Sequence, residues 1–196
     1  MTADGTAAGA FTARPLTQST WPDLEELFGL PGGSIVRGCW CMFYRRTGKD
    51  SGLNAERNKQ ALCDLVSEDV VPGLIGYSGD RPAGWISLGP RSDYLKMRRS
   101  PIMKPVDDAE VWSVICSYVA RPYRGQGVAH RLLAAGIEHA RSQGVQILEA
   151  YPVDKPGRSH DDFMYFGARS LYERAGFREV IRRSPSRVVM RLSLAL

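Results

Sequence analysis

The chain has 196 residues, of which 43% are hydrophobic and 24% are charged. These proportions are ordinary for one globular domain and exclude a disordered chain, and no apolar run reaches the roughly 18 residues that a membrane-spanning helix needs. The formal charge of +5 indicates an anionic partner, which the charge alone does not identify as a cofactor phosphate, a nucleic acid or a lipid surface.

Composition predicts where the folded domain begins and in which cellular compartment the protein lies. Residues 1–10 (MTADGTAAGA) are small and lack a periodic apolar pattern, which predicts a disordered tail and leaves 11–196 as a single domain. The N-terminus has neither the basic start nor the apolar stretch of a secretory signal. The four cysteines do not form the dense framework of a secreted scaffold. We therefore expect reduced thiols in a cytoplasmic protein.

The first half of the chain alternates between strand and helix patterns. Apolar spacing and turn residues predict a strand, a helix, a second helix with Asn54 as N-cap, and an antiparallel hairpin around Gly79-Asp80-Arg81. The predicted ranges are Phe11–Leu16, Trp21–Phe28, residues 55–68, Gly73–Ser78 and Pro82–Leu88. After them, Arg91–Ser100 is predicted as a short helix and Pro101–Asp108 as a loop that closes over a cleft.

The second half contains the clearest pattern. Val111–Ala120 is almost entirely β-branched, aromatic or small, as a strand buried on both faces should be, and Gly127–Gln143 has one apolar helical face. Together with a strand over Gln146–Tyr151 they predict a right-handed βαβ crossover. A helix over Ala168–Ala175 and two closing strands, at 179–181 and 188–194, complete a mixed α/β fold.

The turn between the central strand and its helix predicts a phosphate site. A helix that starts directly after a buried strand presents free backbone N–H groups and the positive end of its dipole to an anion. Gly125 and Gly127 keep Cβ atoms out of the way, Arg124 adds a guanidinium, and Gln126 adds a backbone N–H. Glycine spacing alone fits a simple tight turn equally well.

Two segments in the right order resemble the GNAT N-acetyltransferase superfamily. Val119–Ala129 (VARPYRGQGVA) is similar to its acetyl-CoA-binding motif, and Ala168–Phe177 is similar to its late helix. The resemblance implies a GNAT-like fold: a mixed, mostly antiparallel sheet flanked by helices, with a βα pyrophosphate turn. It also implies direct transfer of an acetyl group from acetyl-CoA to a primary amine of a small molecule. The implied cofactor-binding residues are Tyr118, Val119, Arg124, Gly125, Gln126, Gly127, Val128 and Ala129.

The resemblance also suggests catalytic roles. Tyr172 matches the tyrosine that protonates the departing CoA thiolate, and the alternative for it is a packed core ring. An amine nucleophile needs a base, for which Glu149 and Glu110 are the candidates, and either is equally well explained as a structural acid. At Tyr165 the chain departs from an asparagine common in the family. The long segment Asp154–Phe166 is expected to shape the acceptor pocket.

Several other signals leave alternatives open. Trp40, Phe43 and Tyr44 either pack in the core or line an acceptor pocket, and Cys116 is expected as a core thiol. Cys39 and Cys41 lack the further ligands that zinc requires, so no metal is predicted. The competing functions are a catalytically silent acyl-CoA sensor and a nucleic-acid-binding module. The latter rests on the arginines at 178, 182, 183, 187 and 191, which a guarded sheet edge explains equally well. We expect no membrane or nucleic-acid partner, and a homodimer stays open.

Overall fold

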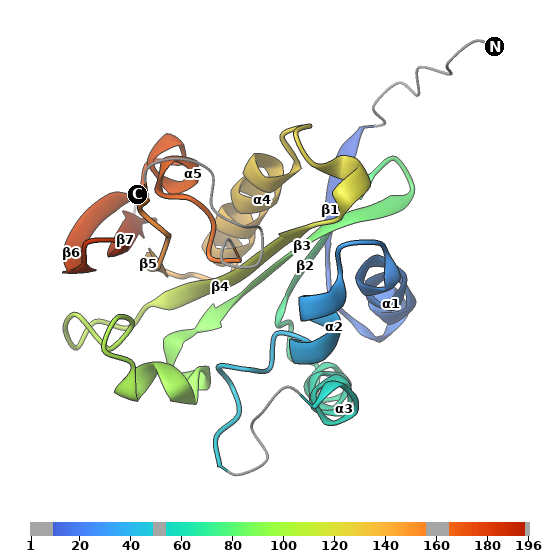
Figure 1. The fold of residues 1–196 in the computed structure, drawn as a ribbon, viewed down its shortest axis with the longest axis horizontal. Helices are drawn as coiled ribbons and strands as arrows, with labels where there is room; N and C mark the ends of the chain where they lie inside the picture. The colour runs from blue at the N-terminus through green and yellow to red at the C-terminus, as the bar shows by residue number, and fades with distance from the viewer. Residues whose placement is uncertain (1–9, 49–53, 156–164, 195–196) are drawn as a thin grey trace.

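The computed structural model describes residues 10–48, 54–155 and 165–194 (Figure 1). Its strands and helices are β1 (Phe11–Pro15), α1 (Trp21–Gly29), α2 (Ser34–Cys39), α3 (Ala55–Ser67), β2 (Gly73–Ser78), β3 (Arg81–Pro90), β4 (Trp112–Val119), α4 (Val128–Ser142), β5 (Ile147–Ala150), α5 (Arg169–Arg174), β6 (Arg178–Ser184) and β7 (Arg187–Ser193). Single turns of 3-10 helix lie at 18–20, 91–93, 95–99 and 121–123.

All seven strands form one sheet in the order β1-β2-β3-β4-β5-β7-β6. Every neighbouring pair is antiparallel except β4 and β5, which are parallel and are joined through α4. The predicted mixed, mostly antiparallel sheet with a βαβ unit at its centre is therefore confirmed. Among the described residues, no helix is long and apolar enough to cross a bilayer.

Helices cover both faces of the sheet (Figure 1). On one face, Leu132, Leu133 and Ile137 of α4 pack with α5 residues against Ile86 and neighbouring strand residues. On the other face, α1, α2 and α3 cover a second core, whose largest members are Phe28, Trp40, Tyr77, Trp85 and Tyr118. The alternation of side chains along β3 and β4 separates these two cores, as expected of strands buried on both faces.

The sheet opens in the middle of β4. Strand β4 pairs with β5 only over Trp112–Val114, whose partners are 148–150. In the β3–β4 register, Ser87 lies opposite Cys116 and Leu88 opposite Val114, so Ile115 is an extra, bulged residue. Beyond the bulge, the N–H of Ser117 donates to the carbonyl of Tyr165 at 2.7 Å instead of to β5. The second half of β4 therefore has a free side that faces away from β3.

Three elements differ from the sequence-based expectation. Helix α2 was not predicted, because Gly33 and Gly38 interrupt its apolar pattern. Residues 91–99 form two 3-10 turns instead of a short α-helix, and β6 extends over seven residues where three were predicted. The N-cap of α3 is confirmed, since the Asn54 side chain accepts a hydrogen bond from the N–H of Arg57. The predicted tail and most of the Asp154–Phe166 segment lie outside the described residues.

Candidate functional site

The backbone conformation of the turn before α4 leaves room for an anion at the helix N-terminus. Gly125 and Gly127 have φ values of +76° and +75°, a region that side chains disfavour, and Gly127 is the N-cap of the 15-residue helix α4. A Cβ added at Gly125 would meet no atom within 4 Å, and one added at Gly127 would meet only Nη2 of Arg131, at 3.8 Å. Both glycines therefore border open space in front of the helix N-terminus, where unpaired N–H groups lie.

A cleft of about 550 Å³ begins at this turn and follows the free side of β4 toward α5. It is lined by Ser117, Tyr118, Val119, Tyr123, Arg124, Gly125, Gly127, Val128, Ala129, His130, Tyr165, Gly167, Ala168, Ser170 and Leu171. The structure thus brings together all the expected cofactor-binding residues except Gln126. The side-chain amide of Gln126 donates to the carbonyl of Pro122 at 2.9 Å.

Tyr118 and Val119 contribute to this cleft in different ways. Backbone groups of successive strand residues point alternately toward and away from a neighbouring strand. The N–H of Ala120 donates to Ala83 on the β3 side at 3.0 Å, and that of Ser117 donates to Tyr165 on the free side. Hence Val119 directs its N–H into the cleft, whereas the backbone of Tyr118 faces β3. The Tyr118 side chain packs in the core with Phe28, and its buried hydroxyl has no partner among the described residues.

The geometry fits a pyrophosphate at the turn and an extended chain along β4. The helix N-terminus and the exposed guanidinium of Arg124, whose Nε donates to the carbonyl of Val119 at 3.1 Å, supply positive charge at one end. The N–H of Val119, for which the described residues provide no acceptor, supplies a fixed donor farther along. The sequence could not give this second feature, because it depends on the separation of β4 from β5.

Tyr172 lies in α5, behind the wall of the cleft. Its side chain is 1% exposed and its ring packs edge-on against Phe177 at a centroid distance of 5.2 Å. A Cβ added at Gly167, which lines the cleft, would lie 3.6 Å from the Tyr172 hydroxyl. Burial, and to a lesser extent the nearby Cys116, raise the pKa of Tyr172, so its phenol stays protonated at neutral pH.

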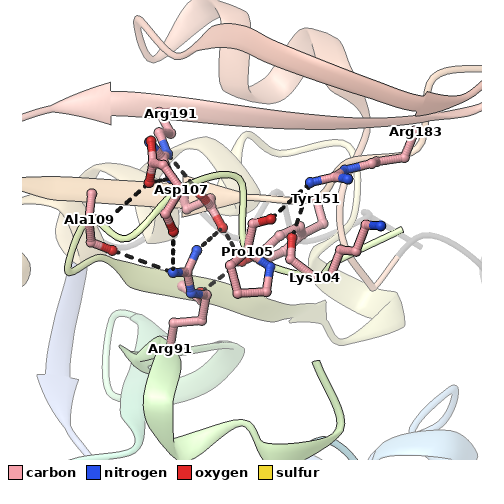
Figure 2. A network of polar contacts seen from close by, with 10 residues as sticks. Arg91, Lys104, Pro105, Asp107, Ala109, Tyr151, Arg183 and Arg191 are labelled. Carbon is pink, nitrogen blue, oxygen red and sulfur yellow. Dashed lines mark hydrogen bonds and ion pairs between the residues drawn. The ribbon is translucent and has the colours of Figure 1, made fainter. Parts of the chain in front are cut away.

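Glu149 is buried and belongs to an ion-pair network whose members Arg91, Asp107, Tyr151 and Arg191 are labelled in Figure 2. Its side chain is 0% exposed; Oε2 accepts from Nε of Arg191 at 2.7 Å, and Oε1 accepts from Nη1 of Arg91 at 3.3 Å and from the Tyr151 hydroxyl. Arg191 also binds both carboxylate oxygens of Asp107, at 2.6 and 2.9 Å. Both oxygens of Glu149 are thus engaged by cations or by a hydroxyl.

This network lies at the other end of β4 from the free backbone groups. Glu149 is opposite Ser113, before the bulge, and it does not line the cleft. Glu149 was expected to border the acyl site, but it lies away from the cleft. The reason is that β5 separates from β4 after the next residue pair, Val114 and Ala150. Glu110 is exposed and also precedes β4. Neither acid is placed beside the cleft.

The loop Pro101–Asp108, which was predicted to close over a cleft, is instead held by hydrogen bonds from Arg183 and Arg191. Asp107 is held by Arg191, and the carbonyls of Lys104 and Pro105 accept from Nη2 of Arg183 at 3.4 and 3.0 Å (Figure 2). The Arg191 guanidinium, with help from the Ala109 backbone N–H, lowers the pKa of Asp107 from its ordinary 3.8 to about 2. The loop therefore braces β6 and β7.

A second cavity, of about 280 Å³, adjoins the cleft. Phe43 and Tyr44 line it, together with Cys116, and Tyr165 lines both spaces. Trp40, in contrast, stacks on Trp21 at 5.8 Å within the core. Phe43 and Tyr44 thus line a cavity, whereas Trp40 packs in the core, and the buried Cys116 also lines the cavity.

Two of the five arginines on the β6–β7 hairpin are neutralised within the chain. Arg182 pairs with Asp154 and Glu179, and Arg191 pairs with Asp107 and Glu149. Paired guanidinium groups are not available to phosphates, which removes the main argument for a nucleic-acid-binding surface. Within the described part of the chain, no group of three or more His, Cys, Asp or Glu side chains is arranged to hold a metal ion.

Comparison with known proteins gives matches in family and in fold. A family model described as "Acetyltransferase (GNAT) family" matches residues 40–177, more than half of the chain. No curated protein sequence matches it. An N-acetyltransferase from Staphylococcus aureus Mu50 is similar in structure, with a TM-score of 0.56, 14% identity, and coverage of 95% of this chain and 100% of the other.

Two further structures are similar at the level of fold. The PaiA N-acetyltransferase from Thermoplasma acidophilum, solved in complex with coenzyme A, has a TM-score of 0.53 and 14% identity, covering 94% of this chain and 99% of its own. The ribosomal-protein-S18-alanine N-acetyltransferase from Escherichia coli has a TM-score of 0.50 and 14% identity, covering 95% of this chain and 96% of its own. At such identities the likeness concerns the fold and leaves the acceptor undetermined.

Proposed function

The chain belongs to the GNAT acetyltransferase family, and on that premise we propose that it is an N-acetyltransferase that transfers an acetyl group directly from acetyl-CoA to a primary amine of a small molecule. The observation that carries this proposal is the turn at Gly125 and Gly127. Both residues have positive φ, and they open the N-terminus of α4 onto a cleft that continues along the free side of β4.

The residues of the turn would hold the pyrophosphate of acetyl-CoA. Their backbone N–H groups and the dipole of α4 offer hydrogen bonds and positive potential, and Arg124 adds a permanent charge with two parallel donors. The apolar part of the cleft, with Val119 and Leu171 among its lining residues, suits an extended aliphatic arm. Acetyl-CoA supplies the activated acyl group; the protein supplies position and charge stabilisation.

Two groups are proposed to act at the reacting end. The N–H of Val119 is fixed in the strand and points into the cleft, where it would stabilise negative charge that develops on the thioester oxygen. Tyr172 stays protonated because of its burial and would deliver a proton to the departing sulfur. With Glu149 neutralised by arginines, proton removal from the amine is assigned to solvent in the cleft.

A pair of matched variants tests the binding site. Acetyl-CoA at about 100 times its Kd should stabilise the wild type by about 2.7 kcal/mol, which raises the Tm by roughly 5–10 °C for a chain of this size. Gly127→Glu should abolish this shift, because it puts bulk and negative charge at the pyrophosphate position.

Gly144→Glu is the control for backbone strain. Gly144 follows the same helix, has a φ of +72°, and has no atom within 4 Å of an added Cβ, so both variants replace an equally exposed left-handed glycine. The control should keep the shift. If both variants keep it, the turn does not bind the cofactor. Release of free CoA thiol with a panel of amines then separates an enzyme from a catalytically silent sensor.

A further inference from the structure

The cavity beside the cleft contains a cation with no countercharge. Arg187, at the start of β7, is the one charged side chain among the described residues that line this cavity. The guanidinium carbon lies 5.4 Å from the centroid of the Phe166 ring. No Asp or Glu oxygen of the described residues lies within 4 Å of it, whereas Arg182 and Arg191 on the same hairpin each pair with two carboxylates.

The remaining walls of the cavity are apolar or aromatic. Tyr44 and Phe166 meet edge-to-face at 5.6 Å, and Ile115 and Cys116 of the β4 bulge form the floor. The positive charge of Arg187 acts on the Tyr44 hydroxyl, where it opposes the rise in pKa that burial causes. The charge of Arg187 and the Tyr44 hydroxyl are therefore the main polar groups beside otherwise apolar walls.

An unpaired guanidinium at an apolar cavity is suited to an anionic ligand group. Arginine stays charged at all physiological pH values, and its planar fork matches a carboxylate in a bidentate arrangement. Such a pair is stronger where apolar walls exclude water. The cavity volume, about 280 Å³, lies near the lower end of the range for small-molecule sites. The ligand is thus a small apolar molecule with an anionic group.

Because the cavity adjoins the cofactor cleft, the other end of such a ligand would lie near the acyl group. Cys116 lines the cavity and the next residue, Ser117, lines the cofactor cleft, while Tyr165 lines both. A molecule whose anion meets Arg187 and whose body lies against Tyr44 and Phe166 therefore reaches the cleft with its opposite end. In an acceptor, that end carries the amine.

We propose that Arg187 determines acceptor specificity by binding the carboxylate of a small apolar amine, so that the acceptor is an amino acid with an aliphatic or aromatic side chain. This inference rests on the proposed N-acetyltransferase activity. It disfavours polyamines, since a second cationic group would meet the guanidinium of Arg187.

Matched substrate pairs test the carboxylate requirement. CoA thiol release is measured with phenylalanine against 2-phenylethylamine and with leucine against 3-methylbutylamine; aminoalkylphosphonates form a third arm that distinguishes carboxylate from phosphonate recognition. The wild type should have kcat/KM values about 30-fold to 100-fold higher for the carboxylated member of each pair, as expected for one charge-assisted pair. Arg187→Gln should lower kcat/KM for the carboxylated member of each pair and thereby remove this preference.

Arg178→Gln is the charge-matched control, because Arg178 is an exposed arginine of the same hairpin that does not line the cavity. It should keep the preference. Equal kcat/KM for both members of the pairs in the wild type, or an unchanged preference in Arg187→Gln, overturns the inference. A preference for phosphonates would retain Arg187 as the anion site and refute the amino-acid assignment.

The acetyl-CoA thermal shift separates this failure from failure of the proposed function. If acetyl-CoA stabilises the protein and both members of each pair are acetylated without any carboxylate preference, the enzyme assignment holds and the role of Arg187 is refuted. If acetyl-CoA stabilises the protein and no member of the panel is acetylated, the amino-acid acceptor is refuted. Absence of both the shift and turnover refutes the acetyltransferase assignment itself.

Discussion

Replacement of Glu149 by glutamine distinguishes a structural acid from a general base. The amide preserves the volume of the side chain and can still accept from Tyr151 or Arg91. Its NH2 group, however, would then face Nε of Arg191, which is also a donor and lies 2.7 Å from Oε2 in the native protein. The variant loses one charge-assisted hydrogen bond and the countercharge of two arginines in a fully buried position.

The expected loss of stability follows from these contacts. Breaking a buried pair by removing one charge typically costs about 3–5 kcal/mol. Arg191 keeps both of its bonds to Asp107, so we expect the lower end, about 3 kcal/mol. For a chain of this length, that corresponds to a decrease in Tm of roughly 6–12 °C. A catalytic base would instead cost roughly 100-fold to 10,000-fold in rate.

Two measurements on the same protein decide between these roles. Thermal unfolding should show the decrease in Tm, and single-turnover acyl transfer, well below the Tm, should stay within about three-fold of the wild-type rate, short of the loss expected for a base. Glu138→Gln is the control, since Glu138 pairs with Arg141 on the exposed face of α4 and its loss should change stability by less than about 1 kcal/mol. A 100-fold slower reaction in a Glu149→Gln protein with a wild-type Tm would refute the structural role.

Two further substitutions test the proton donor and the loop brace. Tyr172→Phe should lower the single-turnover rate of acyl transfer by roughly ten-fold to a thousand-fold, while the acetyl-CoA thermal shift stays the same. An unchanged rate would show that Tyr172 only packs in the core. Asp107→Asn should lower the Tm at neutral pH. The folded-state pKa of Asp107, about 2, lies below its ordinary 3.8, so its stabilisation is complete above about pH 4 and is lost as the pH falls toward 2. A Tm difference between the two proteins that persists at pH 2 would contradict this assignment.

Local patterns in the sequence were sufficient for most of the fold. The apolar strand before Arg124, the left-handed glycines and the apolar face of α4 are features of consecutive residues, so they predicted the βαβ unit and the phosphate turn. The cap at Asn54 and the hairpin between β2 and β3 were predicted for the same reason. Helix α2 was missed because it is stabilised by its packing with α1 and α3, while its own sequence contains two interior or flanking glycines.

The site required contacts between residues that are distant in the chain. The bulge at Ile115 and the early separation of β5 from β4 decide that Val119, and not Tyr118, directs its backbone N–H into the cleft. Similarly, Glu149 is of a residue type that can act as a base, yet Arg91, in the turn after β3, and Arg191 of β7 neutralise it. No pattern of neighbouring residues encodes either fact.

The sequence by itself determined the mixed α/β class, the position of the glycine turn before α4 and the family, because backbone conformation at glycines and the periodicity of apolar residues are local properties. Only the tertiary structure decided which charged groups are neutralised and which face a cavity. Five arginines of the last two strands look alike in the sequence. Acids from other segments neutralise Arg182 and Arg191, whereas Arg187 lies at an apolar cavity with no countercharge among the described residues. The energy of a charge depends on its three-dimensional surroundings, which sequence order does not specify.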